Sequence, residues 1–304
     1  MSAQHEIRTE QLRSGYGARV VVDGVDLVVP SGRISVIVGA NACGKSTLLK
    51  TIARLLPAQD GAVVLDGRRI DTIPTKELAR TLGLLPQQPV APEGIVVTDL
   101  VGRGRHPHQK LFRPWTTADD QAVTSAMAAA GVLDLADRAV DELSGGQRQR
   151  VWIAMALAQS TDVLLLDEPT TFLDVSHQIE VLDLLTDLNR TRGTTIVMVL
   201  HDINLAARYA DHMVALRAGR VVADGPPHAV VTAELVREVF ALDSLVVPDP
   251  VSGAPMVLPR GRHHVGIAPG GALDGVADPS SAAASLAPAL SSALSPTSDV
   301  LERP

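Results

Sequence analysis

Apolar residues along most of the chain follow two patterns that alternate. Short runs rich in β-branched residues or leucine are typical of buried strands, and stretches with apolar residues every three or four positions are typical of helices. This alternation predicts a parallel sheet with its ligand site at the carboxyl ends of the strands. The predicted core strands are residues 33–38, 82–85, 163–167, 195–200 and 212–217, and the predicted helices include 175–192 and 203–209.

The N-terminal part of the chain carries short strand patterns with few helical stretches among them. This arrangement predicts a small antiparallel sheet, with strands at residues 7–9, 20–22, 25–29 and 62–65. Helical patterns dominate the segment between residues 88 and 141, with candidate helices at 97–101 and 117–130. We therefore expect an α/β core with a parallel sheet, an N-terminal antiparallel β subdomain and an inserted helical subdomain.

The composition changes after His264. Residues 265–304 are rich in Ala, Ser, Pro and Gly and contain no aromatic residue. Such a segment buries too little apolar surface to offset the entropy lost on ordering. We predict one folded domain over residues 1–264 and a mostly disordered tail over residues 265–304.

The overall composition argues against several classes of function. No apolar run approaches the roughly 18 residues that cross a bilayer, and the polar N-terminus shows no secretory signal. The formal net charge is −7 and aromatic residues make up 2%, whereas nucleic-acid binders usually present a basic face or a stacking platform. We therefore expect no nucleic-acid partner. The single cysteine, Cys43, excludes a disulfide within the chain, and all these features fit a cytoplasmic protein.

One loop has the spacing of a phosphate-binding motif. Residues 39–46 read GANACGKS and satisfy G-x-x-x-x-G-K-[ST], between a predicted strand and a helical pattern that stops at Pro57. The N–H groups and the dipole of a helix N-terminus favour a bound anion. The motif predicts that Lys45 contacts the β- and γ-phosphates and that Ser46 binds Mg²⁺. The predicted nucleotide-binding residues of this loop are Gly39, Ala40, Asn41, Ala42, Cys43, Gly44, Lys45, Ser46 and Thr47.

The predicted strand at 163–167 ends in two carboxylates, Asp167 and Glu168. Asp167 is expected beside the Mg²⁺ shell, and Glu168 near the γ-phosphate, where a base can orient a water molecule. The alternative is a buried strand with an acidic end that enters a helix. The phosphate-loop motif upstream makes that alternative improbable.

Residues 143–147 read LSGGQ and precede another helical pattern. Ser144 and Gln147 have the S-x-x-Q spacing of a capping box. Gly145 and Gly146 would also let a phosphate approach the backbone closely at the helix N-terminus. One chain cannot easily use two such anion sites on one γ-phosphate. We therefore expect a head-to-tail dimer, in which residues 144–146 of one copy close the phosphate loop of the other.

In this order the motifs resemble those of the ATP-binding-cassette (ABC) ATPases, over roughly residues 7–262. The resemblance implies that Tyr16 stacks on adenine and that Gln87 touches Mg²⁺ and the attacking water. It also implies that His201 contacts the γ-phosphate and that Asp174 links the two sites of a dimer. Taken alone, each of these four residues has a simpler explanation, such as a helix cap for Asp174. The resemblance rests on the occurrence of all the motifs in the family's order. The implied catalytic residues are Glu168, His201, Gln87 and Asp174, the Mg²⁺ ligands are Ser46, Gln87 and Asp167, and the nucleotide is ATP.

The phosphate loop departs from the usual G-P-N-G-x-G-K-S of this family at Ala40 and Ala42. Alanine at 42 costs little if the backbone there is helical or extended, but nucleotide affinity should suffer if φ is positive. Cys43 lies near a helix N-terminus, so a lowered pKa is expected, with alkylation that blocks hydrolysis and protection by MgATP. The simpler interpretation is a small residue that fits a crowded turn.

The resemblance also implies a cellular role. In this family a helical subdomain, here about residues 88–160, receives a coupling helix from a membrane permease, which would be a separate chain. Residues 84–112 and 244–264 resemble the ferric-siderophore branch of the importers, whose near relatives import vitamin B12 and haem. The implied protein is peripheral, lies at the cytoplasmic face of the inner membrane, and depends indirectly on an extracytoplasmic substrate-binding protein.

Two other classes of protein remain open. Soluble ABC proteins of translation usually carry two cassettes, and those of DNA repair split the cassette with a long coiled coil. One compact cassette and an acidic net charge speak against both. A different phosphate-loop enzyme, such as a small-molecule kinase, has no use for the LSGGQ segment.

Overall fold

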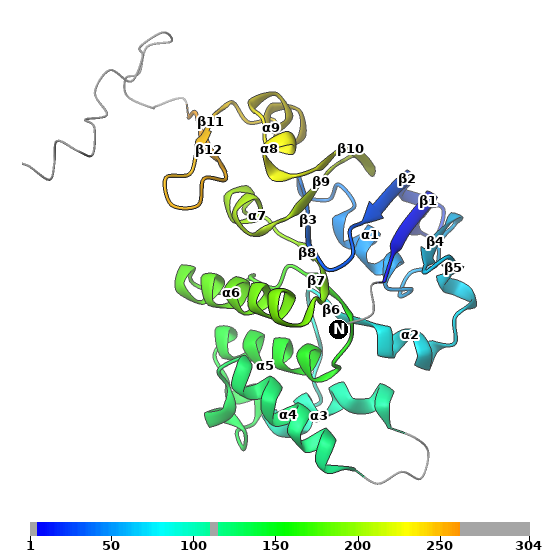
Figure 1. The fold of residues 1–304 in the computed structure, drawn as a ribbon, viewed down its shortest axis with the longest axis vertical. Helices are drawn as coiled ribbons and strands as arrows, with labels where there is room; N and C mark the ends of the chain where they lie inside the picture. The colour runs from blue at the N-terminus through cyan, green and yellow to red at the C-terminus, as the bar shows by residue number, and fades with distance from the viewer. Residues whose placement is uncertain (1–4, 110–114, 262–304) are drawn as a thin grey trace, which may run out of the picture. The chain divides into compact units, whose positions relative to one another are not determined.

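The structure of the protein is a computed structural model that describes residues 5–109 and 115–261. The chain divides into two units, Met1–Arg260 and Gly261–Pro304, and the first holds every described helix and strand (Figure 1). The predicted tail at 265–304 lies outside the described residues. The predicted division into a domain at 1–264 and a tail therefore stays a prediction.

A six-stranded sheet forms the centre of the first unit, in the order β10-β9-β3-β8-β7-β6. Only β10 is antiparallel to its neighbour, which confirms the predicted parallel core. Three of the four inner strands, β3, β8 and β7, are buried along their whole length, so their sequences read as continuous apolar runs. The strands are β3 (Ile34–Gly39), β6 (Leu82–Leu85), β7 (Val163–Asp167), β8 (Thr195–Val199), β9 (His212–Arg217) and β10 (Arg220–Gly225).

A second sheet is antiparallel, in the order β2-β1-β4-β5, and confirms the predicted N-terminal subdomain. Its first two strands are longer than predicted. They keep pairing through polar positions because register shifts absorb the irregularities, one of them beside Gln11 at φ 45°. The strands are β1 (Ile7–Tyr16), β2 (Arg19–Val29), β4 (Asp60–Leu65) and β5 (Arg68–Arg69).

The central sheet separates two hydrophobic clusters. Val36 faces a cluster that it shares with the helices after β6, whereas Ile37 faces a cluster shared with α1 (Lys45–Ile52) and the antiparallel sheet. This split follows from the alternation of side chains along a strand. Helix α1 ends well before Pro57, where the sequence had placed its end. Arg54 lies at φ 58°, outside the helical region.

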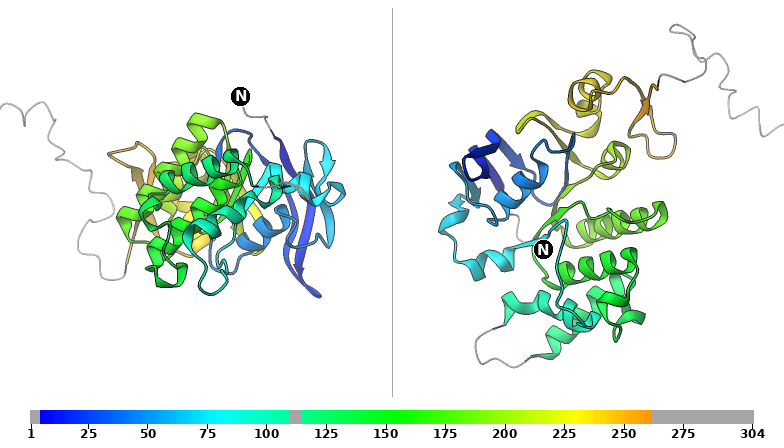
Figure 2. Two further views of the ribbon diagram at one scale, coloured as in Figure 1. Left: turned by 90° about the horizontal axis from the view of Figure 1, so that it is seen from below. Right: turned by 180° about the vertical axis from the view of Figure 1, so that it is seen from behind.

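Three helices form the insertion between β6 and β7. They are α3 (Val97–Gly102), α4 (Thr117–Ala129) and α5 (Gly145–Ala158), and they contact one another. The views from the front and from behind both place them away from the antiparallel sheet (Figures 1 and 2). Helices α6 (Val175–Arg192) and α7 (Ile203–Tyr209) have the bounds that the sequence predicts.

The remaining elements are short. No helix of residues 5–109 and 115–261 is long and apolar enough to span a bilayer. The other helices are α2 (Thr75–Thr81), α8 (Pro227–Val230) and α9 (Ala233–Phe240), with 3₁₀ turns at Ile70–Thr72, Arg103–His108, Leu133–Leu135 and Val140–Glu142, and a hairpin is formed by β11 (Ser244–Pro248) and β12 (Pro255–Pro259).

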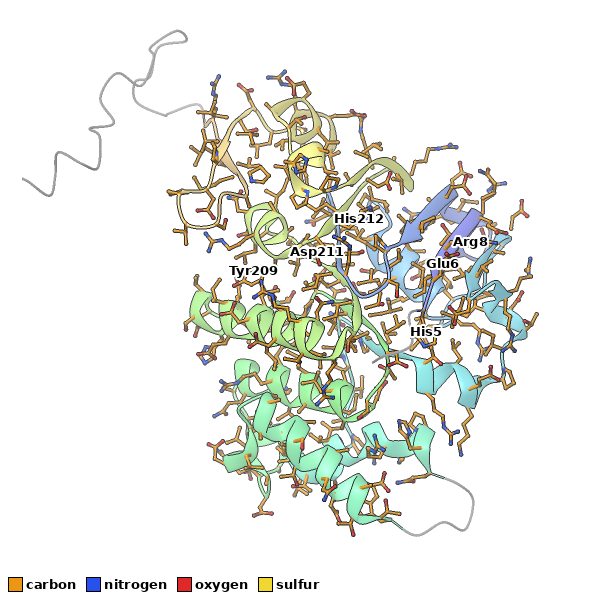
Figure 3. All side chains as sticks on the ribbon, viewed as in Figure 1. His5, Glu6, Arg8, Tyr209, Asp211 and His212 are labelled. Carbon is orange, nitrogen blue, oxygen red and sulfur yellow. The ribbon has the colours of Figure 1, made fainter. Side chains whose placement is uncertain are left out.

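His5 ties the antiparallel sheet to the central one. Its Nδ1 lies 2.6 Å from the carboxylate of Asp66, which follows β4, and its Nε2 lies 3.3 Å from the carboxylate of Asp162, which precedes β7. In the view of Figure 3, His5 lies below the antiparallel sheet. These contacts help to fix the start of β1 against the core.

The β11–β12 hairpin is fastened to α7. The side-chain amide of Asn204 accepts a hydrogen bond from the Val257 backbone N–H at 2.7 Å and donates to its carbonyl oxygen at 3.2 Å. Arg208 pairs with the buried carboxylate of Asp249 at 2.7 Å. Hydrogen bonds from Ser252, the Val251 N–H and Arg208 lower the pKa of Asp249 to about 2. Helix α7 is therefore held from its outer side.

Candidate functional site

The loop between β3 and α1 folds around its own lysine. Lys45 is buried, and its Nζ donates to the carbonyl oxygens of Gly39 at 2.9 Å and Ala40 at 3.0 Å. Gly39 has φ 154°, and a Cβ there would lie 2.3 Å from the carbonyl oxygen of Leu216, so only glycine fits. The N-cap of α1, Gly44, offers no side-chain hydrogen bond. The first N–H groups of α1 therefore have no side-chain cap.

Ala42 has φ 60°, which lies in the left-handed region. The sequence left open whether the backbone at this position is helical or extended, or has a positive φ. The structure has the positive φ, which is the strained conformation. A non-glycine residue there costs roughly 1–2 kcal/mol relative to a right-handed conformation. Ala40, the other departure from the usual motif, is not among the described residues with positive φ. The strain of this loop is therefore concentrated at Ala42.

The predicted lowering of the Cys43 pKa is wrong. Burial raises the pKa of the Cys43 thiol, and the nearby charge of Lys45 opposes that rise only in part. The thiol is packed inside the loop, since its Sγ lies 2.7 Å from where a Cβ on Gly39 would stand. Proximity to a helix N-terminus suggested a reactive thiolate, but desolvation has the larger effect here. Cys43 is the small residue of a crowded turn.

Ser46 and Asp167 meet below this loop. The Ser46 hydroxyl donates to Oδ1 of Asp167 at 2.8 Å. Asp167 is 1% exposed, and its Oδ2 has no hydrogen-bond partner among the described residues. Burial raises the pKa of Asp167, whereas the Ser46 hydrogen bond lowers it. A hydroxyl and a free carboxylate oxygen are the hard oxygen ligands that Mg²⁺ prefers, so these two residues fit that ion.

Glu168 is the centre of a second group of contacts. Its Oε2 accepts from the Gln87 amide at 2.6 Å and from the Thr171 hydroxyl at 3.2 Å. Its Oε1 lies 2.6 Å from Nε2 of His201, which follows β8. Glu168 is buried and has φ 57°, a conformation that is uncommon for a residue with a side chain. The structure thus joins Gln87, Glu168 and His201, which are far apart in the sequence.

One cleft of about 550 Å³, within the usual range for small-molecule sites, is lined by most of these groups but not by Gly39, Ala40, Cys43 or Asp167. The exposed ring of Tyr16 forms part of its wall. The cleft lies at the carboxyl ends of the central strands, as the strand–helix alternation predicts. Its lining residues are Tyr16, Arg19, Val21, Asn41, Ala42, Gly44, Lys45, Ser46, Thr47, Gln87, Glu168 and His201.

The LSGGQ segment does not line this cleft. Ser144 and Gln147 form the predicted capping box of α5, with the Gln147 N–H donating to the Ser144 hydroxyl and the Ser144 N–H donating to the Gln147 side chain. Asp174 likewise caps α6 through the N–H of His177. Hydrogen bonds from the His177 N–H and from Ser176 lower the pKa of Asp174 to about 2.

Two polar contacts hold the segment after β7, one within it and one to α5, and sequence reasoning missed both. Thr171 donates to Glu168, and the Gln149 amide of α5 donates to the carbonyl oxygen of Pro169 at 2.9 Å. Helix α5 is therefore fastened to the chain that carries Glu168. A hydroxyl three residues after a site carboxylate could have suggested Thr171, whereas no sequence signal marks Gln149.

Comparison with known proteins identifies the family. The family model described as ABC transporter matches residues 22–171. The ferric enterobactin transport ATP-binding protein FepC of Escherichia coli is 52% identical over 256 residues, which cover 84% of this chain and 94% of that protein. The chain belongs to the ABC transporter ATPases. As a member, it binds ATP and is an ATPase.

Solved structures agree with this ABC ATPase fold. A metal-chelate type ABC transporter in an inward-facing conformation has a TM-score of 0.73 at 28% identity, over 85% of this chain and 98% of that one. The dimeric cassette MJ0796 has a TM-score of 0.65 at 28% identity, over 72% of this chain and 98% of that one. The cleft of this ATPase thus belongs to a fold seen both in a transporter and in a cassette dimer.

Proposed function

We propose that this chain is the ATP-hydrolysing subunit of an importer that takes up a ferric siderophore through separate membrane permease subunits. The identity to a ferric enterobactin ATPase over nearly the whole length of both chains carries the proposal. The similarity to a metal-chelate type transporter supports it independently. The resemblance of residues 84–112 and 244–264 to the siderophore branch points the same way.

In the proposed site the adenine of ATP stacks on Tyr16, and residues 39–47 surround the phosphates. Lys45 already lies among the carbonyl groups of the loop, so its ammonium is placed without a large change of rotamer. The loop N–H groups and Lys45 then oppose the phosphate charge.

Ser46, Asp167 and Gln87 are the proposed residues that hold Mg²⁺. When bound, this ion neutralises charge on the β- and γ-phosphates. The unpartnered Oδ2 of Asp167 supports the assignment, because a buried carboxylate oxygen is costly without a partner. Gln87 instead donates to Glu168 here, so it has to exchange that contact to reach the ion.

Glu168 is the proposed base for the attacking water. Its buried carboxylate is oriented by Gln87, Thr171 and His201, which leaves few orientations open to it. We propose that His201 contacts the γ-phosphate once ATP is present and thereby leaves Glu168 free to accept a proton from water. Asp174, outside the cleft, is the proposed link to the second site.

A second copy of the chain completes the proposed site. Ser144, Gly145, Gly146 and Gln147 lie outside the cleft of their own chain, so they are assigned to the cleft of a head-to-tail partner. The exposed side chains of Phe172 and Val175 lie in the same region of the chain as Asp174. Burial of these apolar groups between two copies would stabilise such a dimer.

The proposed partners follow from the transport role. They are integral-membrane permease subunits, contacted through the helical subdomain, and indirectly an extracytoplasmic substrate-binding protein. The ATPase itself would be peripheral, at the cytoplasmic face of the inner membrane.

Uptake by cells whose only copy is Lys45→Ala tests the whole proposal. Labelled ferric siderophore, vitamin B12 and haem are offered in parallel, with Arg33→Ala as a control that removes an exposed cation outside the cleft. Loss of ferric-siderophore uptake alone is expected. Loss of B12 or haem uptake instead would move the chain to a neighbouring branch, and normal uptake of all three would refute the iron assignment.

A further inference from the structure

The hairpin turn that carries Tyr16 also carries an arginine. Tyr16 and Arg19 are paired across the β1–β2 turn, with Gly17 at φ 57° between them. The turn is tight, because a Cβ on Gly15 would lie 1.9 Å from the carbonyl oxygen of Arg19. The position of Arg19 is therefore coupled to that of the ring that we assign to adenine.

Arg19 lines the cleft together with Val21. Two residues apart on β2, they lie on the same face of the strand. The strand also runs close to α1, since a Cβ on Gly44 would lie 3.2 Å from the carbonyl oxygen of Val21. The face of β2 that holds Arg19 thus adjoins the start of α1.

Arg19 differs from the other charged groups of the cleft in having no partner. Lys45 donates to two loop carbonyl groups, and Glu168 is bound by Gln87 and His201. Arg19 is exposed, and among the described residues no side chain or carbonyl group is within hydrogen-bonding or ion-pair distance of its guanidinium. Its five N–H donors are available to a ligand, and their planar arrangement suits phosphate oxygens.

We propose that Arg19 binds the α-phosphate of the nucleotide. Lys45 and the start of α1 serve the β- and γ-phosphates, and Tyr16 serves the base. Because Arg19 lies on the same turn as Tyr16, its guanidinium would face the part of the nucleotide between the base and the β-phosphate, which carries the α-phosphate. This inference rests on the nucleotide site proposed above but not on the identity of the transported substrate.

The binding constants of purified full-length protein for ATP and ADP test the proposal. Removal of one charged hydrogen-bond donor is expected to weaken both nucleotides by the same factor, about 10-fold or more. The variants are Arg19→Gln, Arg19→Lys, and the control Arg33→Gln, which changes an exposed arginine outside the cleft. Arg19→Lys is expected to recover part of the loss, because a lysine keeps the charge but not the planar donors.

Each other outcome has a distinct meaning. Binding constants of Arg19→Gln within twofold of the Arg33→Gln values would make Arg19 a solvated turn residue and overturn the proposal. Weakening of ATP but not of ADP would place Arg19 on the γ-phosphate and overturn it equally. Lys45→Ala serves as the reference for the site. If it binds ATP normally, the nucleotide site itself is misplaced, whereas its failure beside a normal Arg19→Gln rejects only this inference.

Discussion

Two regions of the chain differ in how many of their interactions are made within one chain. One is the cleft at the ends of β3 and β7, and the other is the LSGGQ segment at the start of α5. In the cleft, Lys45, Ser46 and Glu168 already have partners that orient them. Ser144 and Gln147 have only the hydrogen bonds of their own capping box. One chain thus completes the contacts on the phosphate and carboxylate side of the proposed site, and we propose that a second chain supplies the other side.

This difference teaches how function can be divided in a symmetric protein. In a head-to-tail dimer each site combines the phosphate loop of one chain with the LSGGQ segment of the other, so a defect in either segment of one chain damages one site and leaves the other intact. The phosphate loop and the LSGGQ segment can therefore be inactivated separately. Variants on the two sides should fail for different reasons.

The largest expected effect is on the cleft side. Glu168→Gln keeps the size and shape of the side chain but replaces one acceptor oxygen by a donor and removes the base, so hydrolysis should fall by roughly 10²–10⁴-fold. ATP binding should remain, and an ATP-bound dimer should accumulate. Turnover and the elution volume on size exclusion with MgATP measure both effects. Turnover at the level of the unmodified protein would show that Glu168 is not the base.

Mixing two inactive variants tests the division directly. Lys45→Ala damages the phosphate loop, and Ser144→Arg places a bulky cation in the LSGGQ segment. In a head-to-tail mixed dimer both defects fall on one site and the other site is intact. An equal mixture should therefore recover up to about a quarter of normal hydrolysis, since half of the dimers are mixed and each has one sound site.

The control for that experiment is the double variant with Lys45→Ala and Ser144→Arg in the same chain. Both defects then fall on every site, so it should stay inactive at every protein concentration. If the two single variants also fail to complement each other, the two segments do not meet across a dimer in the proposed way.

A smaller effect is expected at Ala42. Ala42→Gly should relieve the strain at φ 60° and, after the larger entropy of the unfolded glycine, stabilise the fold by about 1 kcal/mol or less. ATP affinity should rise or stay constant. Ala40→Gly is the matched control, because Ala40 is not in the left-handed region and glycine there should destabilise. Thermal unfolding of the two variants measures the contrast, and equal shifts would contradict it.

The smallest effect concerns Cys43. Because burial raises the pKa of its thiol, the reactive thiolate is scarce near pH 7, and alkylation by iodoacetamide should be slower than in the unfolded chain. The rate should increase as the pH rises through the pKa. Cys43→Ser gives the background rate. Alkylation as fast as that of the unfolded chain would restore the prediction of a reactive thiol.

The sequence predicted the parts of the fold in which pattern and burial agree. The bounds of β6, β7, β9, α6 and α7 match because uninterrupted apolar runs or clear helical spacing define them. It missed β10, whose alternating exposed and half-buried residues at the sheet edge give only a weak signal. The early end of α1 depends on the conformation of Arg54, which no pattern shows.

The same distinction holds for the cleft. The family resemblance named residues that the structure brings together, since Gln87, Glu168 and His201 do meet. It could not give the sign of φ at Ala42 or the shielding of Cys43, because both depend on how the loop packs. No sequence motif marks Arg19, and its place in the cleft is evident only from the position of β2 beside the loop.

Because the β11–β12 hairpin is bound to α7, a change at the proposed nucleotide site that moves α7 would also move the hairpin. Asn204 is three residues after His201, and its side-chain amide forms hydrogen bonds with both the N–H and the carbonyl oxygen of Val257 on β12. A movement of His201 that shifts α7 must carry the hairpin or break those two hydrogen bonds. A fluorophore at Val251, the highly exposed tip of that hairpin, would therefore record events in the cleft without touching it.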